Sequence, residues 1–306
     1  MPGFATPKKV GIESTPTPSS APARSRRKGL FASRLLHAAT SGSTAPRHGF
    51  PVWMALWKFL IVAGLPGLES LEGGDTEAIR ARLEIRLRED WSTRRAAQTN
   101  TTLPASEAVE NAWKLGRACF ELAEFSSTTA SRSELAKEGI EACRKLLLAQ
   151  PKQPWARYYL GVNLGQLART KTLGALSLVD EMEKHFQMAI DLDPKIDHGG
   201  PDRALGLLYF EAPGWPVSVG NRAKARKHLA RAVEIGPGFP ENSLCLMEAL
   251  LKWQDHPALE KAAAGYAAML PSARSDYKGE VWEWSWTDWD SRWDHLQNVL
   301  RKRALR

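Results

Sequence analysis

A helical pattern that recurs every 43 residues is the feature that most constrains this chain. Phe186 and Pro194 have counterparts 43 residues later in Leu229 and Pro237, and the same shift backwards from Pro194 reaches Pro151. The segments before these prolines carry apolar residues at three- and four-residue steps, which predicts amphipathic helices that end at the proline. The chain is therefore expected to be an array of helical repeats.

A second periodic signal supports this interpretation. Gly116, Gly161 and Gly206 each follow a leucine and lie 45 residues apart. Glycine inside a helix lets two backbones approach closely, although it costs about 1 kcal/mol of helix propensity. The pattern is typical of tetratricopeptide repeats, where small residues of helix A and helix B meet. We predict an all-α, tetratricopeptide-like solenoid of about four helix pairs over residues 106–306.

The units are longer than the usual 34-residue repeat. From each of these three glycines to the proline that ends its unit, the chain runs 31 to 35 residues, which implies extra residues between the A and B helices. Two interpretations stay open at this stage. The extra residues form loops along one side of the solenoid, where binding often occurs, or they lengthen the helices.

The C-terminal end is rich in tryptophan. Trp286, Trp289 and Trp293 fall on one helical face, and Leu296 continues it. Terminal repeats need a cap, so we predict that a final helix closes the array after a fourth pair over 240–270. An aromatic ligand box is the alternative.

The N-terminal region differs in composition. Residues 1–49 carry eight Lys/Arg and one Asp/Glu with many Pro and Ser, which predicts a disordered basic tail. Residues 50–68 are apolar except for Lys58 and are a signal-like or single membrane-anchor segment, with a buried core helix as the alternative. A leading helix is expected over 75–98, separated from the array by a polar joint.

This organisation predicts where the protein resides. The sequence leaves open whether translation starts at Met1 or at Met54, and either start favours export or membrane anchoring. We expect a cell-envelope protein, periplasmic or membrane-anchored through residues 50–68, with the repeat domain exported. A cytoplasmic or organellar location is the alternative, because the basic tail has the composition of a transit peptide.

The charge distribution and the reactive residue types narrow the range of possible functions. The formal charge is +8, but outside the first 50 residues Lys/Arg and Asp/Glu nearly balance, so no nucleic-acid partner is expected. Cys119, Cys143 and Cys245 are expected to be small buried residues, with a Cys119–Cys143 disulfide as the alternative. No nucleophile, acid–base or metal-ligand constellation can be assembled, so we expect no enzyme, cofactor or metal.

Four residues are candidates for binding a ligand or partner: Arg203, Tyr209, Trp215 and Asn242. Trp215 lies in the segment Ala-Pro-Gly-Trp-Pro (212–216), whose prolines and glycine indicate a rigid excursion between two helices. We expect Trp215 to fold back onto the array; exposure to a partner is the alternative.

Arg203 is expected near the start of its helix, where a positive charge is mildly unfavourable. A structural partner such as Asp180, Glu183 or Glu241 would explain it, and a carboxylate ligand is the alternative. His185 and His228 occupy equivalent positions in successive repeats, and both are expected on exposed helix faces.

Residues 182–251 resemble the bacterial TatT-like proteins, tetratricopeptide proteins named for the T component of some TRAP transporters. The resemblance is carried by these elements of the sequence: Gly199-Gly200-Pro201, Arg203, Leu205-Gly206, Ala212-Pro213-Gly214, Gly220, Lys224-Ala225 and Pro240-Glu241-Asn242. It implies a non-enzymatic, exported protein, with a periplasmic solute receptor as its partner and a hydrophobic ligand channel. Trp155, Gly161 and the run from Glu183 to Pro194 are also similar to the regulator-of-microtubule-dynamics family.

These observations predict a non-enzymatic helical repeat scaffold, exported or membrane-tethered. Its inserted loops and concave face would bind a protein partner, which the resemblance places among transporter components. The alternative is a carrier of a small apolar or carboxylate ligand, held in a pocket between repeat helices.

Overall fold

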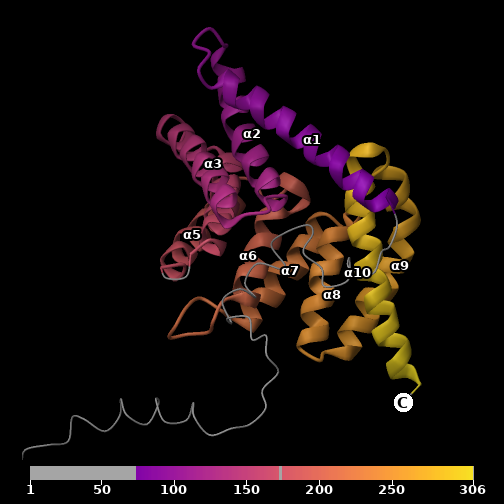
Figure 1. The fold of residues 1–306 in the computed structure, drawn as a ribbon. Coiled ribbons are helices and arrows are strands. Elements are labelled where there is room, and N and C mark those ends of the chain that lie inside the picture. Colours follow the sequence, from indigo (N-terminus) through magenta and orange to yellow (C-terminus); the bar gives the residue numbers. More distant parts are fainter. Residues whose placement is uncertain (1–73, 172–173, 306) are drawn as a thin grey trace, which may run out of the picture. The chain divides into compact units, whose positions relative to one another are not determined.

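The computed structural model describes residues 74–171 and 174–305 (Figure 1), and within them the chain is almost entirely helical. The helices, in chain order, are α1 (Gly74–Ala97), α2 (Ala105–Glu124), α3 (Thr129–Ala149), α4 (Pro154–Arg169), α5 (Leu176–Leu192), η3 (Ile196–His198), α6 (Gly200–Glu211), α7 (Arg222–Ile235), α8 (Pro240–Lys252), α9 (His256–Asp276) and α10 (Glu280–Ala304). The predicted all-α class is confirmed.

The helices pair in the predicted order. Each A helix (α2, α4, α6 and α8) packs against the B helix that follows it (α3, α5, α7 and α9), and each pair packs on the next. Successive A helices also contact one another, more closely than successive B helices do. The array is therefore a helical repeat solenoid with the A helices in its inner layer.

The three glycines lie where the helices of each pair come closest. A Cβ at Gly206 would lie 2.8 Å from Leu229 Cγ and 2.9 Å from the Leu229 backbone nitrogen. A Cβ at Gly161 would collide with the ring of Phe186, and Gly116 faces α3 in the same way. The predicted close approach at these positions is confirmed.

The extra length of the repeats has two causes. In the first pair, α2 and α3 are 20 and 21 residues long and are joined by residues 125–128 only. In the third pair, the helices are shorter and residues 212–221 form a long connection. A loop insertion in every unit is therefore wrong, and helix lengthening accounts for the first pair.

Helix α1 belongs to the array, contrary to the expected polar joint. It continues through Ala97, and its Leu87 and Trp91 pack against buried residues of α2 and α3. Asn111 Nδ2 of α2 donates to the Arg94 carbonyl oxygen at 3.0 Å. The C-terminal half of α1 thus takes the place of a B helix before the first pair.

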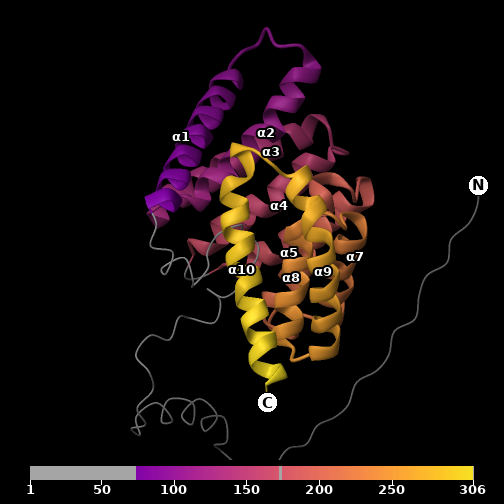
Figure 2. The ribbon, with the colours of Figure 1, turned by 90° about the vertical axis from the view of Figure 1, so that its right-hand side faces the viewer.

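The C-terminal helix closes the other end. In α10, Trp286, Trp289, Trp293 and Leu296 are buried, as predicted, and Trp284 is buried with them. The helix packs on α8 and also contacts α1, and Figures 1 and 2 show the beginning of α1 near the start of α10. Helix α9 continues beyond its predicted end, because its internal proline is accommodated without ending the helix.

The three cysteines are free and buried, so the expectation of small buried residues is confirmed. Burial raises the pKa of the Cys143 thiol to about 12. The predicted tail (1–49) and apolar segment (50–68) lie outside the described residues. No helix in the described ranges is long and apolar enough to cross a membrane.

Candidate functional site

The α6–α7 connection carries the most exposed large apolar side chain of this region. Trp215 is 88% exposed and Val217 is 60% exposed. The expectation that Trp215 folds back onto the array is therefore wrong. The connection closes on itself at its base, so its tip projects away from the helices and cannot reach them.

Backbone contacts hold this connection in one shape. Gly220 N donates to the Pro213 carbonyl at 2.9 Å, and Gly214 and Gly220 form a β-bridge. A Cβ at Gly220 would collide with the carbonyl of Ala212, so only glycine fits there. Residues 212–221 (the Trp215 loop) are thus closed by specific contacts; the Trp215–Pro216 peptide bond is cis.

Tyr209 lies at the base of the Trp215 loop and is buried. Its hydroxyl donates to Glu183 Oε1 at 2.5 Å, and its carbonyl accepts from Asn221 N at 2.8 Å. Burial, and next the neighbouring Glu183, raise the pKa of this tyrosine. Lys224 Nζ lies 4.7 Å from the ring centroid and 3.6 Å from Glu183 Oε1. Tyr209 therefore anchors the loop.

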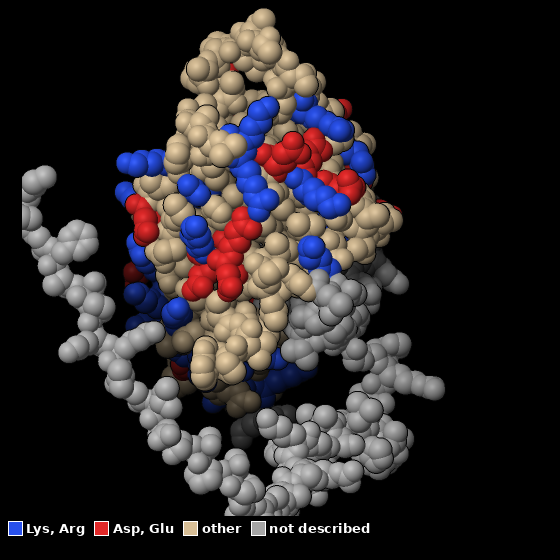
Figure 3. Space-filling model, turned by 90° about the vertical axis from the view of Figure 1, so that its left-hand side faces the viewer, with Lys and Arg blue, Asp and Glu red and all other residues tan. Residues whose placement is uncertain are grey.

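The Trp215 loop itself has no ionisable side chain. On the face drawn in Figure 3, basic and acidic side chains are interspersed. The centres of protein–protein interfaces are depleted in charged residues, so the composition of the loop fits that of an interface centre.

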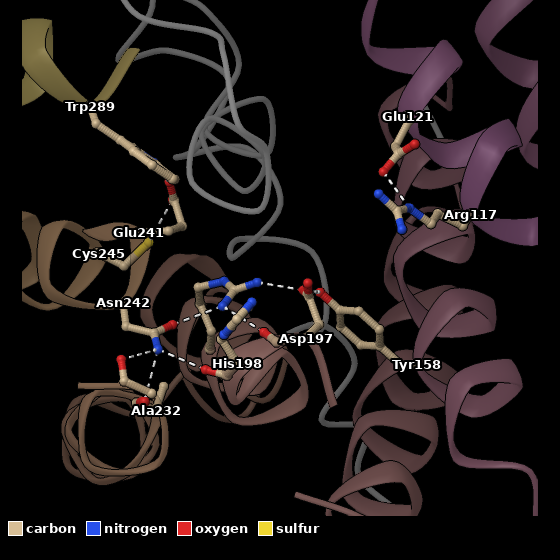
Figure 4. Close-up of polar contacts among 12 residues, drawn as sticks. Arg117, Glu121, Tyr158, Asp197, His198, Ala232, Glu241, Asn242, Cys245 and Trp289 are labelled. Carbon is tan, nitrogen blue, oxygen red and sulfur yellow. Dashed lines mark hydrogen bonds and ion pairs between the residues drawn. The ribbon is translucent and has the colours of Figure 1, made fainter. Parts of the chain in front are cut away.

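Arg203 lies in a buried polar network that joins successive repeats (Figure 4). Its Nη2 donates to Asp197 Oδ2 at 2.6 Å, and its Nη1 donates to Asn242 Oδ1 at 2.7 Å. Tyr158 of α4 also donates to Asp197 Oδ2, at 2.8 Å. The ion-pair partner is Asp197 and none of the three expected carboxylates, because the chain turns back towards α6 at this residue.

Asn242 is fully buried and holds two joints of the chain together. Its Nδ2 donates to the carbonyls of His198 at 2.7 Å and Ala232 at 2.9 Å. The joint before α6 has left-handed backbone at Asp197 (φ 49°), His198 (φ 56°) and Gly199 (φ 86°), and non-glycine residues there cost about 1–3 kcal/mol each. The donors of Arg203 and Asn242 therefore serve the fold.

A second buried ionic cluster lies between α8 and α10. Arg292 bonds to Glu241 (2.8 Å), Glu248 (2.7 Å) and Asp288 (3.0 Å). Trp289 Nε1 donates to Glu241 Oε2 at 2.8 Å. Burial raises the pKa of Asp288 to about 6. Sequence reasoning missed this cluster, although Asp288 and Arg292 stand four residues apart on the tryptophan face.

The two repeat histidines are not on exposed faces, so that expectation is wrong. His185 is buried, and its Nδ1 lies 3.3 Å from Arg157 Nη1. Burial, and next Arg157, lower its pKa to about 4. His228 Nδ1 lies 2.8 Å from Asp202 Oδ1, and Asp202 is fully buried. In the part of the chain that the structure describes, no group of three His, Cys, Asp or Glu could hold a metal.

Two pockets lie away from the four candidate residues. One, of about 280 Å³, is lined by residues of α1 and α10, and the other, of about 450 Å³, by residues of α1, α9, α10 and the α9–α10 turn. Arg203, Tyr209, Trp215 and Asn242 line neither of them. Only Arg203 and Asn242 are brought together by the structure.

A family model described as "Regulator of microtubule dynamics protein 1-3" matches residues 87–198. The match runs from the second half of α1 to the joint before α6, and so covers the first two helix pairs. No curated protein matches the chain. The resemblance to the TatT-like proteins over residues 182–251 is corrected by this finding: the matched family is a different one, and its model matches an earlier part of the chain.

Proposed function

We propose that this chain is a non-enzymatic helical repeat scaffold that binds a protein partner through the Trp215 loop. One observation carries the proposal: Trp215 is 88% exposed on a connection closed by its own backbone contacts. Tryptophan is enriched among the side chains that dominate binding energy at interfaces. A loop already held in one conformation loses little entropy when it binds.

The test is site-specific photocrosslinking in the full chain. A photoreactive residue in place of Val217, beside Trp215, should give one discrete adduct in the protein's native extract. Leu148 of α3 is 86% exposed and is the matched control position, from which the adduct should be absent. Adding Trp215→Ser to the Val217 probe should abolish the adduct. The same adduct from position 148, or an adduct that survives Trp215→Ser, would overturn the proposal.

The apolar segment 50–68 supports a second part of the proposal, that the scaffold is tethered to a membrane or exported. Its 19 residues hold one charge, on Lys58, and a spanning helix needs about 20 apolar residues. Alkaline extraction of membranes should leave the full chain in the pellet, and deletion of residues 50–68 should release it. A full chain that alkaline extraction releases would contradict the tether.

A small-ligand carrier at Arg203 has less support. The guanidinium of Arg203 is already bonded to Asp197 and Asn242, and Asn242 is fully buried. A carboxylate ligand would have to displace Asp197 from Arg203. The protein-binding scaffold is therefore the function that the geometry supports best.

A further inference from the structure

The contact between α1 and α10 leaves a groove that continues on both sides of it. The pockets of about 280 and 450 Å³ share Ile79 of α1 and Glu283 of α10. Arg82 Nη2 donates to Glu283 Oε2 at 2.9 Å across this contact, with the two side chains 60% and 39% exposed. An ion pair this exposed contributes at most about 1 kcal/mol, so it adds little to the contact between the two helices.

Apolar side chains along this groove lack cover from the described residues. Ile85 of α1, which lines the smaller pocket, is 59% exposed. Ile79 and Leu83 are half-buried, and none of the described side chains of α1 is fully buried. Clustered apolar surface with open space beside it is typical of a site that another segment covers.

We propose that residues 50–68 of this same chain dock in the α1–α10 groove. Only residues 69–73 separate this segment from the start of α1, and so short a connection spans at most about 20 Å. Ile79 lies about 8 Å along α1 from Gly74, because a helix rises 1.5 Å per residue. The apolar segment is thus held within reach of the groove.

The chemistry of the segment matches that of the groove. The segment is apolar except for Lys58. The smaller pocket combines Ile79, Leu83 and Ile85 with charged side chains of both signs. Arg82 is paired with Glu283 there, and the other charged lining residues are Arg86, Glu89 and Glu280. The apolar residues offer surface for burial, and the acidic ones offer partners for an ammonium group that cannot be buried unpaired. The closeness of residues 50–68 to α1 in the sequence favours this segment, and not a second copy of the chain, as the occupant of the groove.

Docking in the groove and contact with a bilayer use the same residues, so they exclude each other. The groove then stores the apolar segment while the protein is away from a membrane and releases it at one. This consequence rests on the membrane tether proposed above, whereas the docking itself does not.

Oxidative crosslinking of the full chain without lipid or detergent tests the docking. The native cysteines are buried, so an introduced pair reports its own proximity. Leu60→Cys with Ile85→Cys should give an intramolecular disulfide, and Leu60→Cys with Leu148→Cys, the exposed control on α3, should not. Equal yields from both pairs, or no disulfide, would overturn the proposal. A disulfide-linked dimer would also overturn it, because the occupant would be a second copy.

Vesicle flotation tests the competition. Phosphatidylcholine vesicles should abolish the crosslink between positions 60 and 85. Ile85→Asp should raise the vesicle partition coefficient of the protein about tenfold, which corresponds to about 1.4 kcal/mol of lost docking. Leu148→Asp should leave it unchanged. A crosslink that persists on vesicles, or unchanged vesicle binding in Ile85→Asp, would refute the competition and leave the membrane tether itself unaffected.

Discussion

The helix pairs and the C-terminal closure bury their helices by opposite means. In the pairs, a glycine such as Gly206 lets one helix reach the backbone of the next, near Leu229. In the closure, large aromatic side chains such as Trp289 fill a wider gap, and the buried Arg292 needs three carboxylates around it. Small residues make a contact that depends on space alone, whereas the closure depends on specific polar partners.

The largest expected effect comes from removing the buried cation of the C-terminal closure. Arg292→Met would leave three buried carboxylates without their cation, and breaking a buried ion pair in this way costs about 3–5 kcal/mol. Urea unfolding at pH 7.5 should show the loss, and acidification to about pH 5 should restore part of it, because the pKa of Asp288 is already raised to about 6. Arg274→Met removes an exposed ion pair and should cost about 1 kcal/mol or less.

The next effect comes from filling the close contact between the two helices of a pair. Gly206→Leu places a side chain against Leu229, and overpacking typically costs about 1–3 kcal/mol. The thermal midpoint should fall, and hydrogen exchange should increase in α6 and α7. Gly265→Leu in α9 is the matched control, since no atom lies within 4 Å of its Cβ, and it should be neutral or stabilising. Equal midpoints for the two variants would remove the close contact from this account.

A buried carboxyl group in the first two pairs should make the free energy of unfolding depend on pH. Glu124 accepts hydrogen bonds from Gln166 and from Arg169 Nη1 (3.0 Å), yet burial raises its pKa to about 8. The folded state therefore keeps this proton while the unfolded state loses it near pH 4.5. Stability should fall as pH rises from about 4.5 to 8, by at most about 1.4 kcal/mol per pH unit.

His185 acts in the opposite direction below about pH 6.5, because its pKa is lowered to about 4 and its protonation opposes folding. The measurement therefore belongs between about pH 7.5 and 8, where this histidine is about nine-tenths or more neutral in both states. Glu124→Gln should flatten the slope in that window relative to the unmodified chain. A slope unchanged by Glu124→Gln would show that other groups carry it.

The smallest expected effect concerns the exposed loop. Trp215 contacts little of the array, so Trp215→Ser should change stability by about 0.5 kcal/mol or less. Chemical denaturation measures this directly. A larger loss would mean that the side chain packs in solution, which would return it to the structural role first expected from the sequence.

The sequence predicts the pairs well because their contact is local and repeated. Gly116, Gly161 and Gly206 recur at one spacing, and each faces its own B helix. The tryptophan face of α10 was also predictable, since helical periodicity alone places Trp289 and Trp293 on one side. Both features follow from patterns within a few turns of helix.

The polar contacts could not be predicted in the same way. Arg203 bonds to Asn242, 39 residues away, and Arg292 bonds to Glu241, 51 residues away. Such partners depend on how distant helices pack. The ion-pair partner of Arg203, Asp197, is only six residues away, but it lies before a left-handed turn that helical periodicity does not predict. The exposure of Trp215 was also missed, because backbone contacts at the base of a loop leave no periodic trace.

The run of left-handed residues from Asp197 to Gly199 has a consequence for engineering. Described joints elsewhere in the array, such as the α3–α4 and α8–α9 connections, have no such run. Helix pairs should be exchangeable at those joints. A cut before α6 would instead separate the left-handed corner from Asn242 of α8, which bonds to the His198 carbonyl there. Designed chimaeras of this protein are best spliced on either side of that corner, with α4 to α8 transplanted as one indivisible block.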